Sequence, residues 1–272
     1  MRTQARKIIP GFISITLLAT MLACGVTSGP PTATATANLA PTQTSLPTPT
    51  PIPLNQLVTL SSLSRNETGA APAPAYTLKA QIPVLQGSED GRVTTFNNEM
   101  ALLTQEEIAK FKDNVAETRP LPGSPGSSYD QQYKLLSPPG NLISLQFQIT
   151  IYIYQAAHPN THSRTVNYDL EAGADVRMDQ LFLPGSDYLQ RISNYCIAQL
   201  KTRNIGFDPS SSGAQPLPAN YGNWNITAEG FMITFDAYQV AAYAAGPQVV
   251  VIPYAELQPV IDPHGGLSGF LP

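Results

Sequence analysis

The sequence predicts an α+β fold in which a mainly antiparallel sheet packs against two or three helices, preceded by a signal peptide and a disordered tether. Three observations predict it. The first 75 residues hold an apolar leader and a Thr/Pro/Ala-rich stretch without a periodic apolar face. Beyond residue 75, alternating apolar stretches typical of strands follow one another. Stretches with helical spacing separate them, in the order β-α-β-β-β-α-β-β-β-α.

Residues 1–23 are expected to be a lipoprotein signal peptide. Three basic residues among the first seven precede an uncharged stretch, 8–23, which is shorter than the roughly 20 residues that span a bilayer as a helix. The stretch ends before Cys24 and resembles the bacterial lipobox, although Met21 and Leu22 depart from its common pattern. We therefore expect acylation of Cys24 and anchoring to the outer face of the cell membrane. Ordinary cleavage and an uncleaved short anchor are the alternatives.

Residues 24–75 are expected to form a disordered linker. No charged residue occurs between 25 and 64, and Thr, Pro and Ala dominate the stretch. Such a composition cannot bury enough apolar surface to offset the entropy lost on ordering, and its prolines favour extended backbone. At about 3 Å per residue, the linker would hold a folded module on the order of 100 Å from the membrane.

The composition excludes several classes of function. The chain has 15 Lys and Arg against 19 Asp and Glu, and it lacks the basic footprint of a nucleic-acid-binding protein. Its two cysteines cannot make a disulfide framework or a four-thiolate zinc site. No phosphate-binding loop, dinucleotide glycine motif or G-x-S-x-G motif is present. We expect neither a metal nor a cofactor.

Residues 76–140 are expected to form the N-terminal half of the folded module. Residues 76–84 alternate and predict a strand, with Pro83 at an edge or a strand end. Apolar residues between Val93 and Val115 recur at helical spacing, and a capping-box sequence at Thr104 allows a break between two helices there. The Pro-, Gly- and Ser-rich residues 120–128 predict a loop.

Residues 141–262 are expected to form the C-terminal half, followed by a tail over 263–272. Residues 143–153 are the clearest strand, paired with 164–170 through a loop over 156–162. A helix beginning near Ser186 places Cys196, as a buried free thiol, on its apolar face. The remaining expected elements are a turn at 171–174, a hairpin of 223–227 with 231–235, a strand at 248–252 and a helix at 254–261.

Five segments in this half resemble the RsiV-like family of bacterial extracellular domains of unknown function. They carry its A-H-P, N-x-D-L, L-F, Y-x-V-A-x-Y-A-x-G and I-P-Y-x-E-L motifs at 151–159, 167–174, 178–182, 238–246 and 252–257. The family occurs in the anti-sigma factor RsiV, a lysozyme sensor, and beside the catalytic domain of the peptidoglycan deacetylase PdaC. Gln155 and Ala156 replace a family glycine pair, and Ala174 replaces a lysine. A loop that needed those glycines would differ here.

Neither signalling nor catalysis by these relatives' routes is expected. Only seven residues precede the apolar leader, which leaves no cytoplasmic segment for an anti-sigma factor. His158 and His162 have the H-x-x-x-H spacing of the deacetylase metal motif, and Asp236 lies in a T-F-D-A sequence resembling its T-F-D-D. The order is reversed and Ala237 replaces the second aspartate, so a rearranged His-His-Asp site is only a minor alternative.

The candidate ligand-binding residues are Tyr154, His158, Asp169, Tyr238 and Tyr243, because the family-matching residues lie in loops and at strand ends. Two of them have structural alternatives. His158 would hydrogen-bond Asp169 or a backbone carbonyl, and Asp169 would hold the 171–174 turn through backbone amides.

An aromatic surface is also expected on the first hairpin. Tyr152, Tyr154 and Tyr168 would lie on neighbouring strands, as a contact surface for sugar or protein or as cross-strand packing.

The leading function is a non-catalytic surface lipoprotein that binds or senses cell-wall glycan or an exported protein. Without the leader the chain has 12 basic and 19 acidic residues, so a basic partner such as lysozyme would be attracted. A cryptic wall-polysaccharide hydrolase or deacetylase, and an inert structural lipoprotein, are the alternatives.

Overall fold

A computed structural model describes residues 52–70, 74–119, 121, 123, 125–210 and 212–271. The leader, Cys24 and the first part of the linker lie outside these residues, so the signal peptide and the lipid anchor stay predictions. The chain divides after Pro49, and the part that follows is described by itself. Within the described residues, no helix is both long and apolar enough to cross a membrane.

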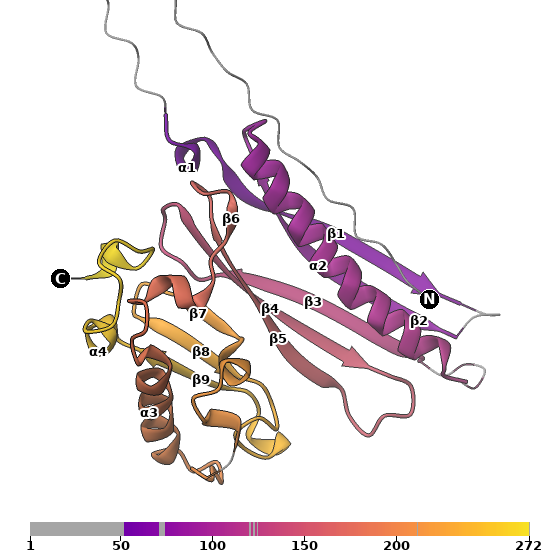
Figure 1. The fold of residues 1–272 in the computed structure, drawn as a ribbon. Coiled ribbons are helices and arrows are strands. Elements are labelled where there is room, and N and C mark those ends of the chain that lie inside the picture. The colour runs from indigo at the N-terminus through magenta and orange to yellow at the C-terminus, as the bar shows by residue number, and fades with distance from the viewer. Residues whose placement is uncertain are drawn as a thin grey trace, which may run out of the picture. The chain divides into compact units, whose positions relative to one another are not determined.

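A six-stranded sheet forms the larger layer of the fold (Figure 1). Its spatial order follows the sequence, and only the pair β2–β3 is parallel. Because parallel neighbours need a long crossover, the helix α2 (Gly91–Ala116) connects these two strands. The strands are β1 (Thr59–Gly69), β2 (Tyr76–Gln86), β3 (Ser127–Leu135), β4 (Leu142–Tyr152), β5 (Asn160–Asp169) and β6 (Ala174–Asp175).

Helix α2 covers one face of this sheet and closes the first core. Its apolar residues recur every three or four positions, which places them on one side of the helix. They pack against alternate residues of β4, which point to the same face of the sheet. The core includes Val93, Phe96, Met100, Ile108 and Phe111 from the helix and Leu145, Phe147 and Ile149 from β4.

The expected break at Thr104 is wrong, because α2 is one continuous helix. Thr104 is buried, and its hydroxyl accepts a hydrogen bond from the Gln131 amide at 2.9 Å instead of capping a helix. Asp90 caps α2, since its carboxylate accepts the Arg92 backbone N–H at 2.9 Å.

A three-stranded antiparallel sheet and a second helix build the other core. The strands are β7 (Trp224–Ile226), β8 (Phe231–Phe235) and β9 (Gln248–Ile252), covered by α3 (Tyr188–Lys201) and followed by the single turn α4 (Tyr254–Leu257). The core contains Ile192, Cys196 and Leu200 of α3 and all the apolar residues of β8 except Met232. The predicted mainly antiparallel α+β fold is confirmed.

Buried polar side chains join the two sheets on the face of β4 and β5 opposite α2. The Ser144 hydroxyl donates to the side-chain amide oxygen of Asn167 at 2.6 Å and accepts from the Asn225 side-chain amide at 2.9 Å. Asn167 in turn donates to the Trp224 carbonyl at 2.9 Å. Because these groups are fully buried, their hydrogen bonds fix how β7 lies on the larger sheet.

The linker prediction is wrong for residues 54–69. They form the single turn α1 (Leu54–Leu57) and β1, which pairs with β2 along its whole length. Leu54 is buried in the first core. The strand β1 is polar because it is the edge of the sheet and exposes most of its side chains, so it lacks the alternating pattern of an interior strand.

The strand β3 was missed by the sequence prediction, which placed a loop at its start. Its buried positions include Ser127 and Gln131 instead of apolar residues. Both are satisfied inside the fold: Ser127 accepts from the Tyr154 backbone N–H at 3.0 Å, and Gln131 accepts from the Tyr129 hydroxyl at 2.6 Å. Polar residues at buried positions hide a strand from any pattern of hydrophobicity.

Several helices and strands begin or end at other residues than the sequence predicts. β5 begins at Asn160, so His162 lies in a strand and not in the hairpin loop. α3 begins at Tyr188 without a side-chain cap from Ser186, and α4 ends at Leu257. The expected tail, 263–272, is described up to Leu271, and it packs on the second core through the fully buried Leu267. The division after residue 140 falls between β3 and β4, which are paired neighbours in one sheet.

Candidate functional site

Three of the five candidate residues, His158, Tyr238 and Tyr243, lie together and form what we name the aromatic corner. His158 lies in the loop between β4 and β5, and the two tyrosines lie between β8 and β9. The His158 and Tyr243 rings stack with centroids 4.0 Å apart and planes inclined by 25°. The Tyr238 ring lies 5.4 Å from that of Tyr243. The Tyr243 hydroxyl donates to the Pro159 carbonyl at 2.7 Å and closes the corner.

The aromatic corner is exposed and its backbone is unusual. Tyr238 is 65% exposed and has φ of +70°, a left-handed conformation that costs energy for a side chain other than glycine. His158 is exposed, and its Nδ1 lies 2.9 Å from the Pro159 carbonyl oxygen, the backbone contact that was the alternative expectation. The corner therefore presents aromatic rings to solvent from a hydrogen-bonded frame.

The hairpin loop keeps a glycine-like backbone without its glycine. Gln155 has φ of +72° at a position where the RsiV-like motif has glycine. A glutamine in this left-handed conformation carries strain that a glycine would avoid.

Tyr154 lies apart from the aromatic corner. It is half-buried, and its hydroxyl accepts the Leu121 backbone N–H at 3.4 Å, close to the end of α2. The expected aromatic surface is wrong for Tyr168, which is fully buried and packs on Phe96 with ring centroids 5.2 Å apart.

Asp169 is a turn residue at the far end of β5. Its carboxylate accepts the backbone N–H groups of Glu171 and Ala172 at 2.8 and 3.2 Å, as the structural alternative expected. Gly173 completes the turn with φ of +69°. Nine residues of strand, roughly 30 Å, separate Asp169 from the loop of His158.

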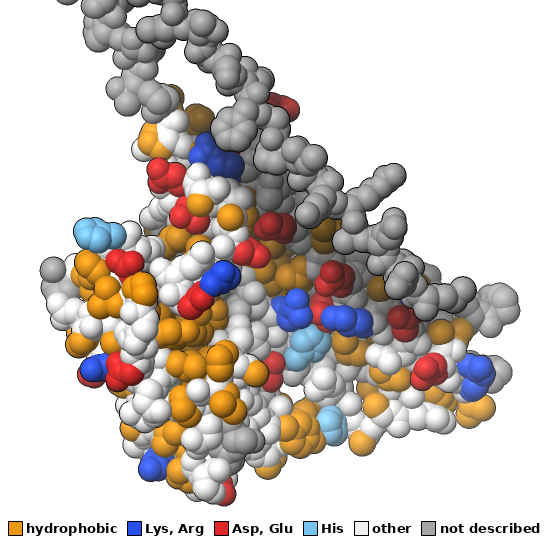
Figure 2. Space-filling model, viewed as in Figure 1, with side chains coloured by type: hydrophobic (Ala, Val, Ile, Leu, Met, Phe, Trp, Pro, Cys, Tyr) orange, Lys and Arg blue, Asp and Glu red, His pale blue; other side chains and the backbone are white. Residues whose placement is uncertain are grey.

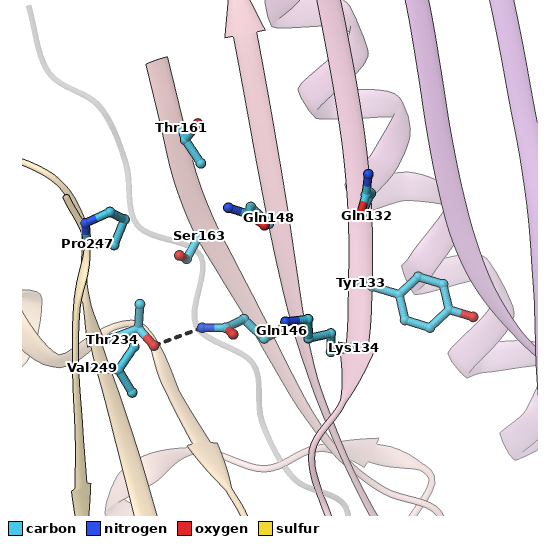
Figure 3. A pocket seen from close by; sticks show the side chains of 10 residues that line it. All are labelled: Gln132, Tyr133, Lys134, Gln146, Gln148, Thr161, Ser163, Thr234, Pro247 and Val249. Carbon is cyan, nitrogen blue, oxygen red and sulfur yellow. Dashed lines mark hydrogen bonds between the residues drawn. The ribbon is translucent and has the colours of Figure 1, made fainter. Parts of the chain in front are cut away.

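A polar cavity of about 210 Å³ lies between the two sheets (Figure 3). No pattern in the sequence indicates this cavity, because the polar residues of β4 alternate as they do on an ordinary solvated face. The Gln146 amide donates to the Thr234 hydroxyl at 2.8 Å across the cavity, and the Tyr133 ring points away from it. The larger sheet contributes Gln132, Lys134, Gln146, Gln148, Thr161 and Ser163. The smaller sheet contributes Thr234 and Val249, and Pro247, directly before β9, completes the wall.

His162 belongs to a charged cluster on the α2 side of the sheet. Its Nε2 lies 3.3 Å from a carboxylate oxygen of Glu107, which also pairs with Lys110 at 3.1 Å and Arg164 at 3.7 Å. Burial opposes ionisation of Glu107, but Lys110, His162 and Arg164 outweigh it, and the pKa of Glu107 lies below its usual value.

The two histidines of the H-x-x-x-H spacing therefore have different partners. Asp236, the third member of the alternative metal set, accepts the Ser163 backbone N–H at 2.9 Å and the Asn223 amide at 3.2 Å. In the described part of the chain, no three His, Cys, Asp or Glu side chains converge as metal ligands would.

Cys196 is buried on α3, as expected. Burial raises the pKa of its thiol to about 12, which leaves it protonated and unreactive at neutral pH. On the face shown in Figure 2, acidic and basic side chains intermix, and hydrophobic side chains gather over the C-terminal part of the chain.

A family match covers the part of the chain that holds the second core. Residues 179–255 match DUF3298, a family described as a protein of unknown function. Over these residues the chain is similar to that family. The matched residues include α3, β7, β8 and β9 and two of the three rings of the aromatic corner. The predicted resemblance is confirmed.

Two curated relatives share only part of their length with this chain. The peptidoglycan-N-acetylmuramic acid deacetylase PdaC of Bacillus subtilis is 25% identical over 160 residues, 58% of this chain and 34% of PdaC. An esterase of Mycobacterium tuberculosis is 27% identical over 154 residues, 54% of this chain and 65% of the esterase. The chain spans less than two thirds of either relative.

Solved DUF3298 structures share the fold. A member from Bacteroides fragilis aligns with a TM-score of 0.58 at 16% identity, covering 75% of this chain and 94% of the other. One from Pseudomonas aeruginosa aligns with a TM-score of 0.53 at 14% identity, covering 78% and 97%. These structures extend the likeness beyond the matched 77 residues, 179–255, to most of the described fold.

Proposed function

We propose that this chain is a non-catalytic binding or sensing module of the bacterial cell envelope, and that it recognises cell-wall glycan through the aromatic corner. The observation that carries the proposal is the stack of His158 on Tyr243, 4.0 Å apart, beside the 65% exposed Tyr238. Sugar rings have apolar faces that pack on exposed aromatic rings, while their hydroxyls bond the polar groups around them.

The position of the aromatic corner supports a role in ligand binding more than a role in packing the core. His158 and Tyr243 come from loops held by two different sheets, and such loops commonly present contacts on a rigid scaffold. Tyr238 keeps a strained backbone and an exposed ring, a combination that does not serve the core. The relative named as a peptidoglycan deacetylase suggests the wall as the source of the ligand.

An exported basic protein such as lysozyme is a second candidate partner. Residues 76–272 carry 11 Lys and Arg against 18 Asp and Glu, a net charge of −7. A charge of that sign attracts basic proteins and speeds their association at low salt. The attraction would weaken as the Debye length falls from about 10 Å at 0.1 M salt to about 3 Å at 1 M.

Hydrolysis or deacetylation of wall polymer remains the enzymatic alternative, since both curated relatives are named as enzymes. The contacts of the three candidate metal ligands oppose this alternative. His158 and His162 have separate partners, and Asp236 accepts hydrogen bonds from Ser163 and Asn223. An inert structural lipoprotein is the third alternative, and it predicts no binding at all.

The test is sedimentation of the purified full chain with insoluble peptidoglycan. We expect His158→Ala and Tyr243→Ala to reduce the bound fraction at least fivefold. His264→Ala is the matched control, because His264 is also exposed but lies near the C-terminus, outside the corner. Equal binding by all three variants would exclude the aromatic corner as the contact surface.

Two further measurements separate the alternatives. Binding of lysozyme that disappears between 0.1 and 1 M salt, without binding to the wall, would favour the protein partner. Metal-dependent release of acetate from acetylated glycan by the full chain would overturn the non-catalytic proposal.

A further inference from the structure

The polar cavity between the two sheets has the chemistry of a ligand site. Gln132, Gln148 and Ser163 are register partners on β3, β4 and β5, so they form a row across one face of the sheet. Figure 3 shows these side chains on the strands that line the cavity. Amides and hydroxyls both donate and accept hydrogen bonds, so the row suits a ligand rich in hydroxyl and amide groups.

Two members of this row are available to a ligand. In the described part of the chain, neither the Gln148 amide nor the Ser163 hydroxyl has a hydrogen-bond partner, although Ser163 donates its backbone N–H to Asp236. Gln148 is exposed and Ser163 is half-buried. The neighbouring Gln146 is already bonded to Thr234, which holds the cavity in shape.

The charge of the lining selects a neutral ligand. Lys134 is the one charged side chain among the lining residues, and no carboxylate lines the cavity. A phosphate or another strong anion would need several basic groups, and a cation would need an acid. On the opposite wall, Pro247 and the 39% exposed Val249 offer an apolar surface the size of a methyl group or two.

The dimensions of the row fit an extended sugar chain. Adjacent strands lie about 4.8 Å apart, which is close to the rise per residue of an extended β-linked hexose chain. A cavity of about 210 Å³ holds roughly seven waters at 30 Å³ each. One sugar ring would fill it, and the next residues would lie along the open strands.

The segments that line one end of the cavity also lead into the aromatic corner. Thr161 of the lining follows His158 by three residues, and Pro247 follows Tyr243 by four. The hydrogen bond from Tyr243 to Pro159 joins the two loops that carry these residues. A ligand leaving the cavity at this end would meet the exposed rings.

We propose that this cavity binds one residue of a neutral, N-acetylated oligosaccharide, with its hydroxyl and amide groups on Gln148 and Ser163 and its acetyl methyl on Val249. This inference rests on the proposed function and deepens it by assigning the sugar-binding subsite. The aromatic corner then holds the following sugar ring.

The experiment titrates the full chain with the tetrasaccharide of N-acetylglucosamine by calorimetry. We expect Gln148→Ala and Ser163→Ala each to weaken binding about three- to tenfold, the loss of one or two neutral hydrogen bonds. Gln105→Ala is the matched control, since Gln105 is an exposed glutamine on α2, across the sheet. Cellotetraose, which has the same β-1,4 linkage but lacks acetyl groups, should bind at least about fivefold more weakly.

The outcomes separate this inference from the proposed function. Wall sedimentation that depends on His158, with no tetrasaccharide binding or with unchanged binding by Gln148→Ala, would overturn the cavity assignment and leave the proposed function standing. Absence of binding to both wall and tetrasaccharide would overturn both. Val249→Gln provides a second test in case Gln148→Ala alters the structure of β4. The longer side chain narrows the cavity from the opposite wall, so this variant should also weaken tetrasaccharide binding.

Discussion

The Tyr243 hydroxyl donates a hydrogen bond to the Pro159 carbonyl oxygen, 2.7 Å away, and so joins two loops that lie 84 residues apart in the chain. The same tyrosine ring stacks on His158, the residue before Pro159. The Tyr243 side chain thus joins the 155–159 loop to the 238–246 segment, and each of these two segments resembles a family motif. Its hydroxyl and its ring can be tested separately.

Tyr243→Phe keeps the ring and removes the hydroxyl. We expect faster hydrogen exchange in loop residues 155–159 and about threefold weaker wall binding, because the loop loses one hydrogen bond to its frame. Tyr238→Phe is the matched control, since no hydrogen bond of the Tyr238 hydroxyl occurs within the described residues. Equal exchange rates in the two variants would show that the Pro159 contact does not hold the loop.

Gln155→Gly should stabilise the protein. Gln155 has φ of +72°, and glycine adopts that conformation without the penalty of a side chain, so we expect the free energy of unfolding to rise by about 0.5–1 kcal/mol. Ala156→Gly is the control, because Ala156 is not among the described residues with positive φ and glycine there only adds freedom to the unfolded chain. Urea denaturation measures the free energy of unfolding of both variants. A loss of stability in Gln155→Gly would contradict the left-handed backbone conformation of Gln155.

Glu107→Gln should remove a pH-dependent part of the stability. The pKa of Glu107 is lowered in the folded state, so its ion pairs stabilise the protein above the unfolded pKa of about 4.5 and are lost as the pH falls through the folded pKa. We expect the variant to be roughly 1–2 kcal/mol less stable at pH 7, and this difference to shrink as the pH falls below 4.5. Denaturation at pH 7 and at a pH well below 4.5 tests this, and a difference that does not shrink on acidification would mean that charge is not the cause.

Glu106→Gln serves as the control for that measurement. Glu106 neighbours Glu107 on α2 but is exposed, so its replacement should change stability by less than about 0.5 kcal/mol at either pH.

Leu54→Ala should destabilise the folded module, although the sequence places this residue in the linker. Leu54 is buried in the first core, and its truncation is expected to cost roughly 2 kcal/mol. Leu57→Ala, at a position 44% exposed, should be nearly neutral. Limited proteolysis should leave a core that begins near Leu54, and cleavage between β1 and β2 as the first event would instead support a module beginning at Tyr76.

Cys24→Ala tests the predicted lipid anchor, which lies outside the described residues. If Cys24 is acylated, the wild-type chain partitions into detergent and the variant is released or mislocalised. Unchanged attachment of the variant would indicate an uncleaved helix in place of a lipid.

The strands and turns with a local pattern were predictable from the sequence. β4 alternates along its length, and the apolar face that the alternation indicates packs against α2. The turn held by Asp169 was also predictable, because an aspartate bonds the backbone two and three residues ahead of itself. Such features depend on neighbours in the chain, so the residues themselves determine them.

The site was only partly predictable. His158, Tyr238 and Tyr243 were named from motifs, but nothing in the sequence placed them in contact or separated them from Tyr154 and Asp169. His162 shared a motif with His158, yet the alternation of β5 turns it to the face of α2, where Glu107 lies.

The sequence by itself determined the α+β class, the acidic charge, the family resemblance and the elements with an apolar period. Only the tertiary structure decided that β1 and β3 are strands, because an edge position explains the first and buried, hydrogen-bonded polar side chains explain the second. It also created the polar cavity. The polar face of β4 becomes a lining only where β8 and β9 pack beside it, and the contact between Gln146 and Thr234 joins residues 88 positions apart, a distance that no local pattern spans.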